Sequence, residues 1–132
     1  MPDPARDPLI RVAAMPADTN VYGDIFGGWL ISMMDNAAGL VAARHSHGRA
    51  VTVAMDGMQF HLPVKVGDEV SVYGGLTRVG RTSMTIAVEA WSRPRHQDEA
   101  FKVTEAVFTF VAIDDTGRPR EIRSQPHNQE KQ

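Results

Sequence analysis

One acidic residue stands in an apolar segment of this chain, seven positions after a pair of glycines. The segment runs from Gly27-Gly28 through Met33-Met34 to Asp35. A buried, ionised carboxylate is costly unless it is paired or hydrogen-bonded, so Asp35 is either well satisfied or put to chemical use. Two uses fit an acid in such a place. One is general-base activation of water, the other is direct nucleophilic attack, and the residues leave both open.

The two glycines supply a second kind of group that such chemistry needs. The apolar pattern after them predicts a helix, so Gly27 and Gly28 open it, where backbone amides lack intrahelical partners and the helix dipole favours negative charge. Because Gly28 has no side chain, a carbonyl group can approach these donors closely. Such donors stabilise the oxyanion of a tetrahedral transition state. A glycine pair is also typical of a tight turn, and an acid on a helix is often simply paired with an arginine.

The spacing of Gly28 and Asp35 has a consequence for assembly. Seven residues are close to two helical turns, so both lie on nearly the same helical face, about 10 Å apart along the axis. One small acyl group cannot easily reach both. If two such helices pack antiparallel across a two-fold axis, Gly28 of one subunit approaches Asp35 of the other, and two equivalent sites form. We therefore expect a homodimer with shared sites.

The elements that position these residues follow from the hydrophobic period. Residues 9–15 predict a short first strand. From Gly28 to Gly48 the period is helical, and Gly39 within this helix suggests close packing against a sheet. The apolar stripe of the helix consists of Leu30, Met33, Met34, Ala37, Ala38 and Val41.

After Gly48 the period changes to two, which predicts strands. Alternating runs occur at 51–56, 70–73 and 84–89, and the run 101–113 is nearly continuously apolar in its second half, as in a central strand. One helix followed by meandering strands predicts an α+β fold. We expect an antiparallel sheet of about five to six strands, wrapped around one long central helix.

Length and composition limit the possible classes of function. The chain has 132 residues, and we expect one domain over 11–120, between a flexible N-terminus (1–10) and a polar, disordered tail (121–132). With 14 basic and 16 acidic side chains and a net charge of -2, the chain is not expected to bind nucleic acid. It has no cysteine, no run long enough to span a membrane and no signal-peptide pattern, so we expect a cytoplasmic protein without a membrane partner. His45 and His47 have no carboxylates at ligand spacing, and no metal site is expected.

Several segments together carry a family resemblance. They are Met15-Pro16-Ala17-Asp18-Thr19-Asn20, Gly23-Asp24-Ile25-Phe26-Gly27-Gly28-Trp29, Met34-Asp35, Val51-Thr52-Val53-Ala54, Val79-Gly80-Arg81-Thr82-Ser83, Thr104-Glu105-Ala106-Val107-Phe108-Thr109 and Gly117-Arg118-Pro119-Arg120. In these segments the chain resembles the hotdog-fold acyl-CoA thioesterases, particularly the bacterial YciA type. The resemblance implies hydrolysis of acyl-CoA to a free acid and CoA, with no cofactor beyond the CoA of the substrate. It also implies paired subunits that form one continuous sheet, and a trimer of dimers.

The resemblance also suggests roles for individual residues. Asn20 is the family's residue that places substrate or water, although Asn is an ordinary turn residue too. Asp24 is ambiguous in the same way, since an acid near a helix start stabilises the dipole. The expected catalytic residues are Asp35, Asn20 and Gly28, and the expected CoA- and acyl-binding residues are Asp24, Gly27, Met58, Phe60, Gly80, Arg81, Thr82 and Ser83.

The residues expected to bind substrate differ in their chemistry. Gly80-Arg81-Thr82-Ser83 offers amides, hydroxyls and a guanidinium, which suit phosphate oxygens. Met58 and Phe60 are candidates for the acyl tunnel, or plain core. Further candidate cations are Arg78, Lys102, Arg118 and Arg120.

Two other functions remain open. One is a noncatalytic module that binds or senses acyl-CoA, which only turnover can distinguish. The other is a hotdog-fold enoyl-CoA hydratase, which would use a His with an acid. Here Gly23-Asp24 is followed by Ile25-Phe26-Gly27, so the hydratase dyad is missing.

Overall fold

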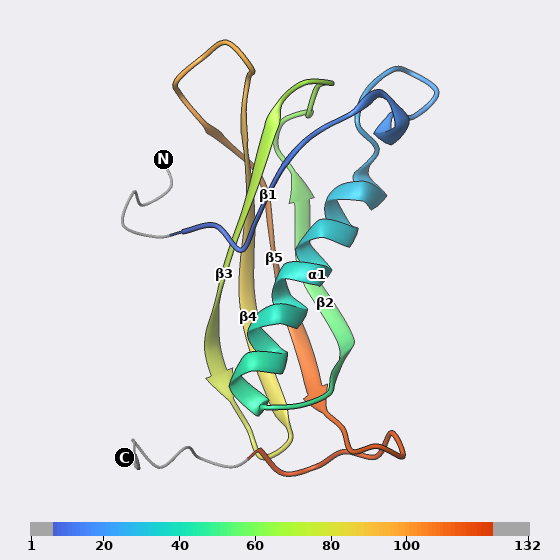
Figure 1. Ribbon diagram of the computed structural model, residues 1–132, viewed down its shortest axis with the longest axis vertical. Coiled ribbons are helices and arrows are strands. Elements are labelled where there is room, and N and C mark those ends of the chain that lie inside the picture. Colours follow the sequence, from blue (N-terminus) through green and yellow to red (C-terminus); the bar gives the residue numbers. More distant parts are fainter. Residues whose placement is uncertain (1–6, 123–132) are drawn as a thin grey trace.

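The architecture is one long helix packed against one face of an antiparallel sheet (Figure 1). The computed structural model describes residues 7–122. Five strands form the sheet in the order β1-β3-β4-β5-β2. The elements are β1 (Ile10–Ala13), a 3-10 turn η1 (Pro16–Asp18), α1 (Gly27–Ser46), β2 (Ala50–Phe60), β3 (Glu69–Val79), β4 (Ser83–Arg93) and β5 (Phe101–Ala112). The predicted fold class and element order are confirmed, and β5 lies between β4 and β2, as expected of a central strand.

Much of what was predicted for the two chain ends lies outside the described residues. This holds for the first six residues of the expected flexible N-terminus and the last ten of the expected tail. Near these limits, Ile10 begins β1, and the amide of Ile122 donates to the carbonyl of Arg81 at 2.8 Å. Among residues 7–122, no helix has the length and apolar character needed to cross a membrane.

Helix α1 buries the apolar stripe that was predicted from the sequence. Leu30, Met34, Ala37 and Ala38 are buried against the sheet, while Met33 and Val41 are partly buried. The helix ends at Ser46, because His47 adopts the left-handed conformation (φ 55°) that commonly closes a helix.

The core lies between α1 and the concave face of the sheet. Alternate strand residues point to opposite faces, and most of those that face the helix from β3, β4 and β5 are buried. They include Val70, Val72, Met84, Ile86, Val88, Phe108 and Phe110. The helix is thus fixed along its length by apolar burial, which positions Gly28 and Asp35 rigidly.

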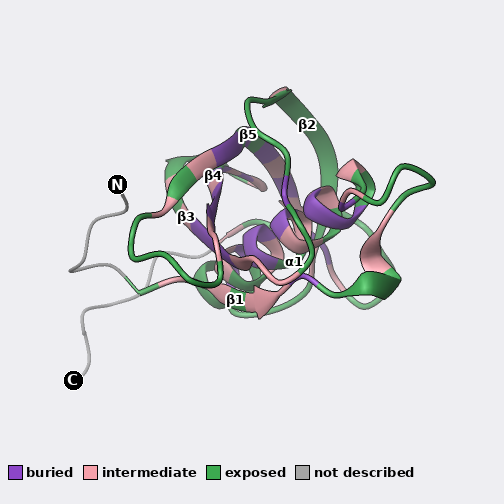
Figure 2. Cartoon of the chain, turned by 90° about the horizontal axis from the view of Figure 1, so that it is seen from above, coloured by how far each residue is buried: buried purple, intermediate pink, exposed green. Residues whose placement is uncertain are grey.

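Strand β2 differs from its neighbours because it is exposed along nearly its whole length (Figure 2). It pairs only with β5, so its other edge is unpaired in the described chain. Apolar side chains are exposed on it, among them Val51, Val53, Met55 and Phe60. A long, exposed, apolar edge strand is an aggregation hazard unless something covers it.

Candidate active site

A shallow hollow lies between the first two turns of α1 and strand β2. Its volume is about 390 Å³, and we call it the Asp35 hollow. It is lined by Gly28, Ile31, Ser32 and Asp35 from α1, Thr52 and Met55 from β2, and Phe108 from β5. The helical residues follow the i, i+3, i+4, i+7 spacing of one face. Gly28 and Asp35 therefore both line the Asp35 hollow, and they lie on one face of the helix, as their spacing predicted.

The carboxylate of Asp35 is half-buried and is held from strand β2. The hydroxyl of Thr52 donates to Oδ1 of Asp35 at 2.6 Å. A hydrogen bond to an ionised acceptor is short and strong, and it fixes the orientation of the carboxylate. Oδ2 accepts no hydrogen bond from residues 7–122, so it stays available to a ligand in the hollow.

Sequence reasoning did not identify Thr52 as a site residue. The alternating run 51–56 predicts that Thr52 lies on one face of a strand. It does not predict that Asp35 of the helix lies opposite that face.

The N-terminal end of α1 presents free backbone donors. The amide of Trp29 bonds to the carbonyl of Phe26 at 3.1 Å, whereas the amides of Gly27 and Gly28 have no partner among residues 7–122. An oxygen that carries developing negative charge suits such a position.

The space above Gly27 is occupied by the ring of Phe60. A Cβ at Gly27 would lie 3.2 Å from Cζ of Phe60, so a larger residue would displace the ring. Gly27 and Phe60 also line a neighbouring hollow of about 290 Å³, together with Ile25, Leu30 and the segment His61-Leu62-Pro63. Of the two residues expected in an acyl tunnel, Phe60 thus lies beside the helix start.

Met58 has a different environment. It packs against the core, and its sulfur accepts from the hydroxyl of Thr104 at 3.1 Å. Met58 is absent from the lining of both hollows. Its placement fits the alternative of plain core.

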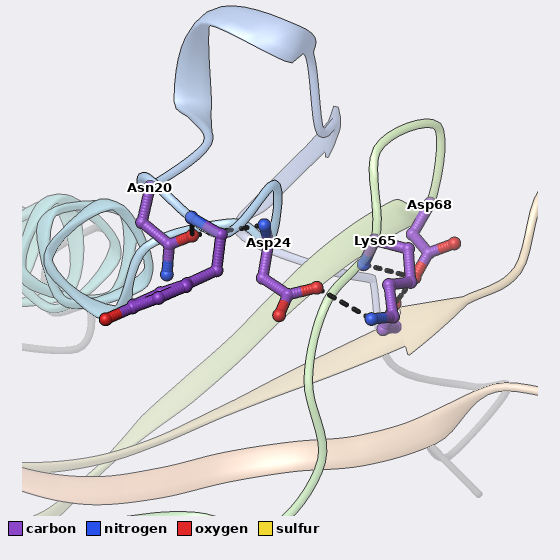
Figure 3. A network of polar contacts seen from close by, with 6 residues as sticks. Asn20, Asp24, Lys65 and Asp68 are labelled. Carbon is purple, nitrogen blue, oxygen red and sulfur yellow. Dashed lines mark hydrogen bonds and ion pairs between the residues drawn. The ribbon is translucent and has the colours of Figure 1, made fainter.

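Asn20 organises the loop that leads into the helix (Figure 3). Its side-chain Oδ1 accepts hydrogen bonds from the backbone amides of Tyr22 at 2.8 Å and Asp24 at 3.2 Å. The backbone amide of Asn20 donates to the carbonyl of Asp24 at 2.7 Å. The side-chain oxygen therefore holds the turn, as an Asx turn does. The Nδ2 donor of Asn20 makes no hydrogen bond within the described residues, and so remains available.

Asp24 is tied to a second loop rather than to either hollow. Its Oδ1 lies 2.6 Å from Nζ of Lys65, and the amide of Lys65 donates to Oδ2 of Asp68 at 3.0 Å (Figure 3). The same oxygen of Asp68 accepts from the hydroxyl of Ser92 at 3.0 Å. The loop that carries Asn20 is thereby linked to strand β4 through three polar contacts.

The turn Gly80-Arg81-Thr82-Ser83 lies at the opposite end of α1 from Gly28. The carbonyl of Thr82 accepts from the amide of Ala112, and the guanidinium of Arg120 bonds to the carbonyl of Ser46, the last residue of α1. Arg81 is exposed and pairs with Glu121 at 3.2 Å. A helix of this length is about 30 Å long, so within one chain this turn and Gly28 are not brought together.

Two of the four further candidate cations, Arg120 and Lys102, have partners of their own. Arg120 donates to the carbonyls of Ile113, Ser46 and Arg49, which makes it a brace for the C-terminal end of the helix. Lys102 lies between Glu105, at 3.1 Å, and Glu89, at 3.9 Å. Across residues 7–122, no three His, Asp or Glu side chains are grouped as metal ligands.

Comparison with known proteins gives a consistent result. A sequence model of the thioesterase superfamily matches residues 22–99. The chain is 59% identical over 119 residues to an uncharacterized acyl-CoA thioester hydrolase of Zymomonas mobilis, covering 90% of this chain and 80% of that protein. It is 45% identical over 122 residues to the acyl-CoA thioester hydrolase YciA of Escherichia coli K12, covering 90% and 92% of the two chains. A hexameric hotdog fold thioesterase of Campylobacter jejuni superposes with a TM-score of 0.87 at 33% identity, covering 96% of this chain and 97% of that one.

Proposed function

The chain belongs to the thioesterase superfamily and has its hotdog fold, and from this premise we propose that it hydrolyses acyl-CoA thioesters at the Asp35 hollow. The observation that carries the proposal is the arrangement of the hollow itself. It combines a half-buried carboxylate, oriented by Thr52, with the free amides at the start of α1. A base and an oxyanion site are the two parts that hydrolysis of a thioester requires.

The reaction needs only water and the substrate. Asp35 accepts a proton from water as the water oxygen bonds to the thioester carbonyl carbon. The carbonyl oxygen becomes an oxyanion, held by the amide of Gly28 at the start of the partner chain's helix. Collapse of the intermediate breaks the carbon–sulfur bond, and the proton passes from Asp35 to the sulfur of CoA, leaving a free acid. The alternative is attack by Asp35 itself through an anhydride, which water then hydrolyses.

The proposal includes a dimer in which two chains complete each site. Gly28 and Asp35 of one helix lie on the same face but about 10 Å apart along it. Antiparallel packing of two helices brings Gly28 of each chain to Asp35 of the other. The exposed apolar β2 supports this arrangement, because pairing of two β2 edges would cover Val51, Val53 and Met55.

The same two-fold arrangement accounts for the distant turn at residues 80–83. In each chain this turn lies at the C-terminal end of α1. With Gly28 opposite the partner's Asp35, the partner's helix continues to its Ser46, about 16 Å farther along the axis. The amides, hydroxyls and guanidinium of the partner's turn would then stand about that far from the first chain's Gly28, where they could hold the phosphates of an extended CoA whose thioester lies at Gly28.

Higher assembly and location extend the proposal. A solved relative from Campylobacter jejuni is described as hexameric, and we propose a trimer of dimers for this chain as well. We place the reaction in the cytoplasm, with which a chain free of cysteine is compatible. The proposal includes no cofactor, because water and the substrate supply every atom of the reaction.

The test is release of CoA thiol by the wild type and by Asp35→Ala and Asp35→Asn. Loss of the base should lower kcat at least about a hundredfold, because general-base catalysis contributes two to four orders of magnitude. The control is Asp115→Asn, which removes an exposed acid in the turn after β5 and should leave kcat unchanged. Folded Asp35 variants with near-wild-type turnover would refute the assignment. Stoichiometric binding of acyl-CoA by a wild type without turnover would instead indicate a sensor.

A further inference from the structure

A third hollow lies on the side of the sheet that faces away from α1. Its volume is about 280 Å³, and we call it the arginine hollow. It is lined by Arg11, Val12, Ala13, Gly67, Glu69, Arg93 and Arg95. Val70 and Val72 point into the core, so their neighbour Glu69 points to the opposite face, where it stands across from Arg93 in the β3–β4 register. The sheet thus separates this hollow from Asp35.

Each guanidinium in the arginine hollow is held in place by a contact that occupies only part of it. Nε of Arg11 donates to the hydroxyl of Ser71 at 2.9 Å, and Nε of Arg95 donates to the carbonyl of Gly67 at 3.1 Å. Oε1 of Glu69 lies 3.0 Å from Nη2 of Arg93 and 3.7 Å from Nε of Arg11. A guanidinium has five N–H donors, so each of the three keeps donors that no group among residues 7–122 uses.

The position of Arg95 depends on a glycine. Gly67 has φ 93°, and a Cβ there would lie 3.3 Å from Nε of Arg95. The guanidinium therefore lies over a surface without a side chain. This contact restrains a long side chain in a loop before any ligand arrives, which reduces the entropy lost on binding.

The charge of the arginine hollow contrasts with that of the whole chain. Three guanidiniums face one carboxylate, a local charge of +2 among the lining residues, whereas the chain has a formal net charge of -2. Neither Arg11 nor Arg93 is deeply buried, with side-chain exposures of 51% and 42%. The concave shape and the unused donors suit a compact anion with more than one charged group.

We propose that the arginine hollow binds a diphosphate group, either as inorganic diphosphate or as part of a nucleoside diphosphate. The ligand bridges Arg11 and Arg95 and competes with Glu69 for Arg93. It is distinct from the acyl-CoA bound at the Asp35 hollow, because the two hollows lie on opposite faces of the sheet. The proposal does not depend on the thioesterase activity.

The test is isothermal titration calorimetry with inorganic diphosphate and with ADP, at low ionic strength. Arg11→Gln and Arg95→Gln should each weaken binding about tenfold, the loss expected for one charge-assisted hydrogen bond. Glu69→Gln should strengthen binding, because it removes the carboxylate that competes for Arg93. The matched control is Arg44→Gln, an exposed arginine of α1 outside the hollow, which should bind as the wild type does. Thermal unfolding verifies that each variant is folded.

Three results would overturn the proposal. The first is the absence of binding heat for the wild type, or equal affinity in the wild type and the Arg95→Gln variant. The second is loss of diphosphate binding in Arg81→Gln, since Arg81 belongs to the proposed substrate site and not to the arginine hollow. The third is a change in oligomer mass for Arg11→Gln or Arg95→Gln, which would identify the hollow as a contact between subunits.

Discussion

The hydrogen bond between Thr52 and Asp35 joins the two elements on either side of the groove. Asp35 belongs to a helix fixed by core packing, whereas Thr52 belongs to the exposed strand β2. The carboxylate is therefore oriented by a strand whose own environment depends on what pairs with its edge. A substitution at Thr52 tests whether this orientation contributes to turnover.

We predict that Thr52→Val lowers kcat about tenfold and leaves KM nearly unchanged. Valine keeps the shape of the side chain but removes the donor, so Asp35 retains its charge and loses its fixed orientation. Thr52→Ser, which keeps the hydroxyl, should recover most of the activity. Steady-state release of CoA thiol measures both variants. Equal losses in Val and Ser variants would show that packing, and not the hydrogen bond, is what matters at this position.

The sequence predicted Asp35 and Gly28 as candidate site residues. It did not predict the contact of Asp35 with Thr52 or the distance of Gly28 from the turn at residues 80–83, and the reason is physical. The helical period places Leu30, Met34 and Asp35 relative to one another, because residues of one helix have fixed angular positions. The contact of Asp35 with Thr52 depends on how far β2 lies from the helix, which no local pattern contains. The wide separation of the turn at residues 80–83 from Gly28 likewise becomes visible only when the hairpin is placed at the far end of α1.

Helix α1 contains one glycine whose expected packing role the structure does not support. Close packing against the sheet was expected at Gly39, yet a Cβ there would lie 3.7 Å from the ring of Phe110, an ordinary van der Waals contact. Glycine in a helix interior costs roughly 0.5–1 kcal/mol relative to alanine. Gly39 therefore weakens the helix without a steric need for it.

We predict that Gly39→Ala raises the free energy of unfolding by about 0.5–1 kcal/mol, measured by urea denaturation. The control is Gly74→Ala in β3, where a Cβ would lie 3.2 Å from Leu9 and 3.4 Å from the carbonyl of Ala87. That variant should be destabilised, because the packed Leu9 side chain must move away from the added methyl group, whereas the distance to the Ala87 oxygen is an ordinary contact. A loss of stability in Gly39→Ala would mean that the helix approaches Phe110 more closely than the structure indicates.

The loop before α1 owes its shape to polar contacts rather than to apolar burial. Val21 and Tyr22 at its tip are 91% and 85% exposed, so little hydrophobic contact restrains it. Asn20 holds the turn internally, and the ion pair between Asp24 and Lys65 fixes it to the loop after β2. Since this loop leads directly into Gly27-Gly28, its position sets that of the proposed oxyanion donors.

We predict that Lys65→Met lowers kcat/KM about tenfold, through displacement of the loop by a fraction of an ångström. The free energy of unfolding should change by less than about 1 kcal/mol, because an exposed ion pair contributes little to stability. Lys65→Arg keeps the charge and should retain most of the activity. Kinetics and urea denaturation, measured on the same samples, separate the two effects. A loss of activity that only follows a loss of stability would argue against a positioning role.

The edge of β2 that is unpaired within residues 7–122 and the one-sided Asp35 hollow both support the proposed dimer. An 11-residue strand with exposed apolar side chains is unsuited to face water, and a groove that opens along one helical face is only half enclosed. Pairing two chains through β2 resolves both features at once. If Gly28 of each chain meets Asp35 of the other, symmetry requires the two-fold axis to pass near Ile31 and Ser32, midway between them.

Shared sites can be tested by mixing two defective chains. Asp35→Ala removes the proposed base, and Gly28→Val places a side chain over the proposed oxyanion donors, so each variant alone should be nearly inactive. In a mixed dimer, one site combines the intact Gly28 of the first chain with the intact Asp35 of the second, while the other site carries both defects. Random pairing yields mixed dimers as half of the population, so co-expression should restore about a quarter of wild-type turnover.

The matched control for this experiment is co-expression of Asp35→Ala with Asp35→Asn. Both defects then fall in the same half of every site, and no pairing can produce an intact one. If the site were built within a single chain, Asp35→Ala with Gly28→Val would behave like this control, because every chain would carry a defect. Recovery in the first mixture and none in the second would locate the two halves of the site on different chains. Equal inactivity of both mixtures, with dimers verified by mass, would place Gly28 and Asp35 in the same site of one chain and refute the shared arrangement.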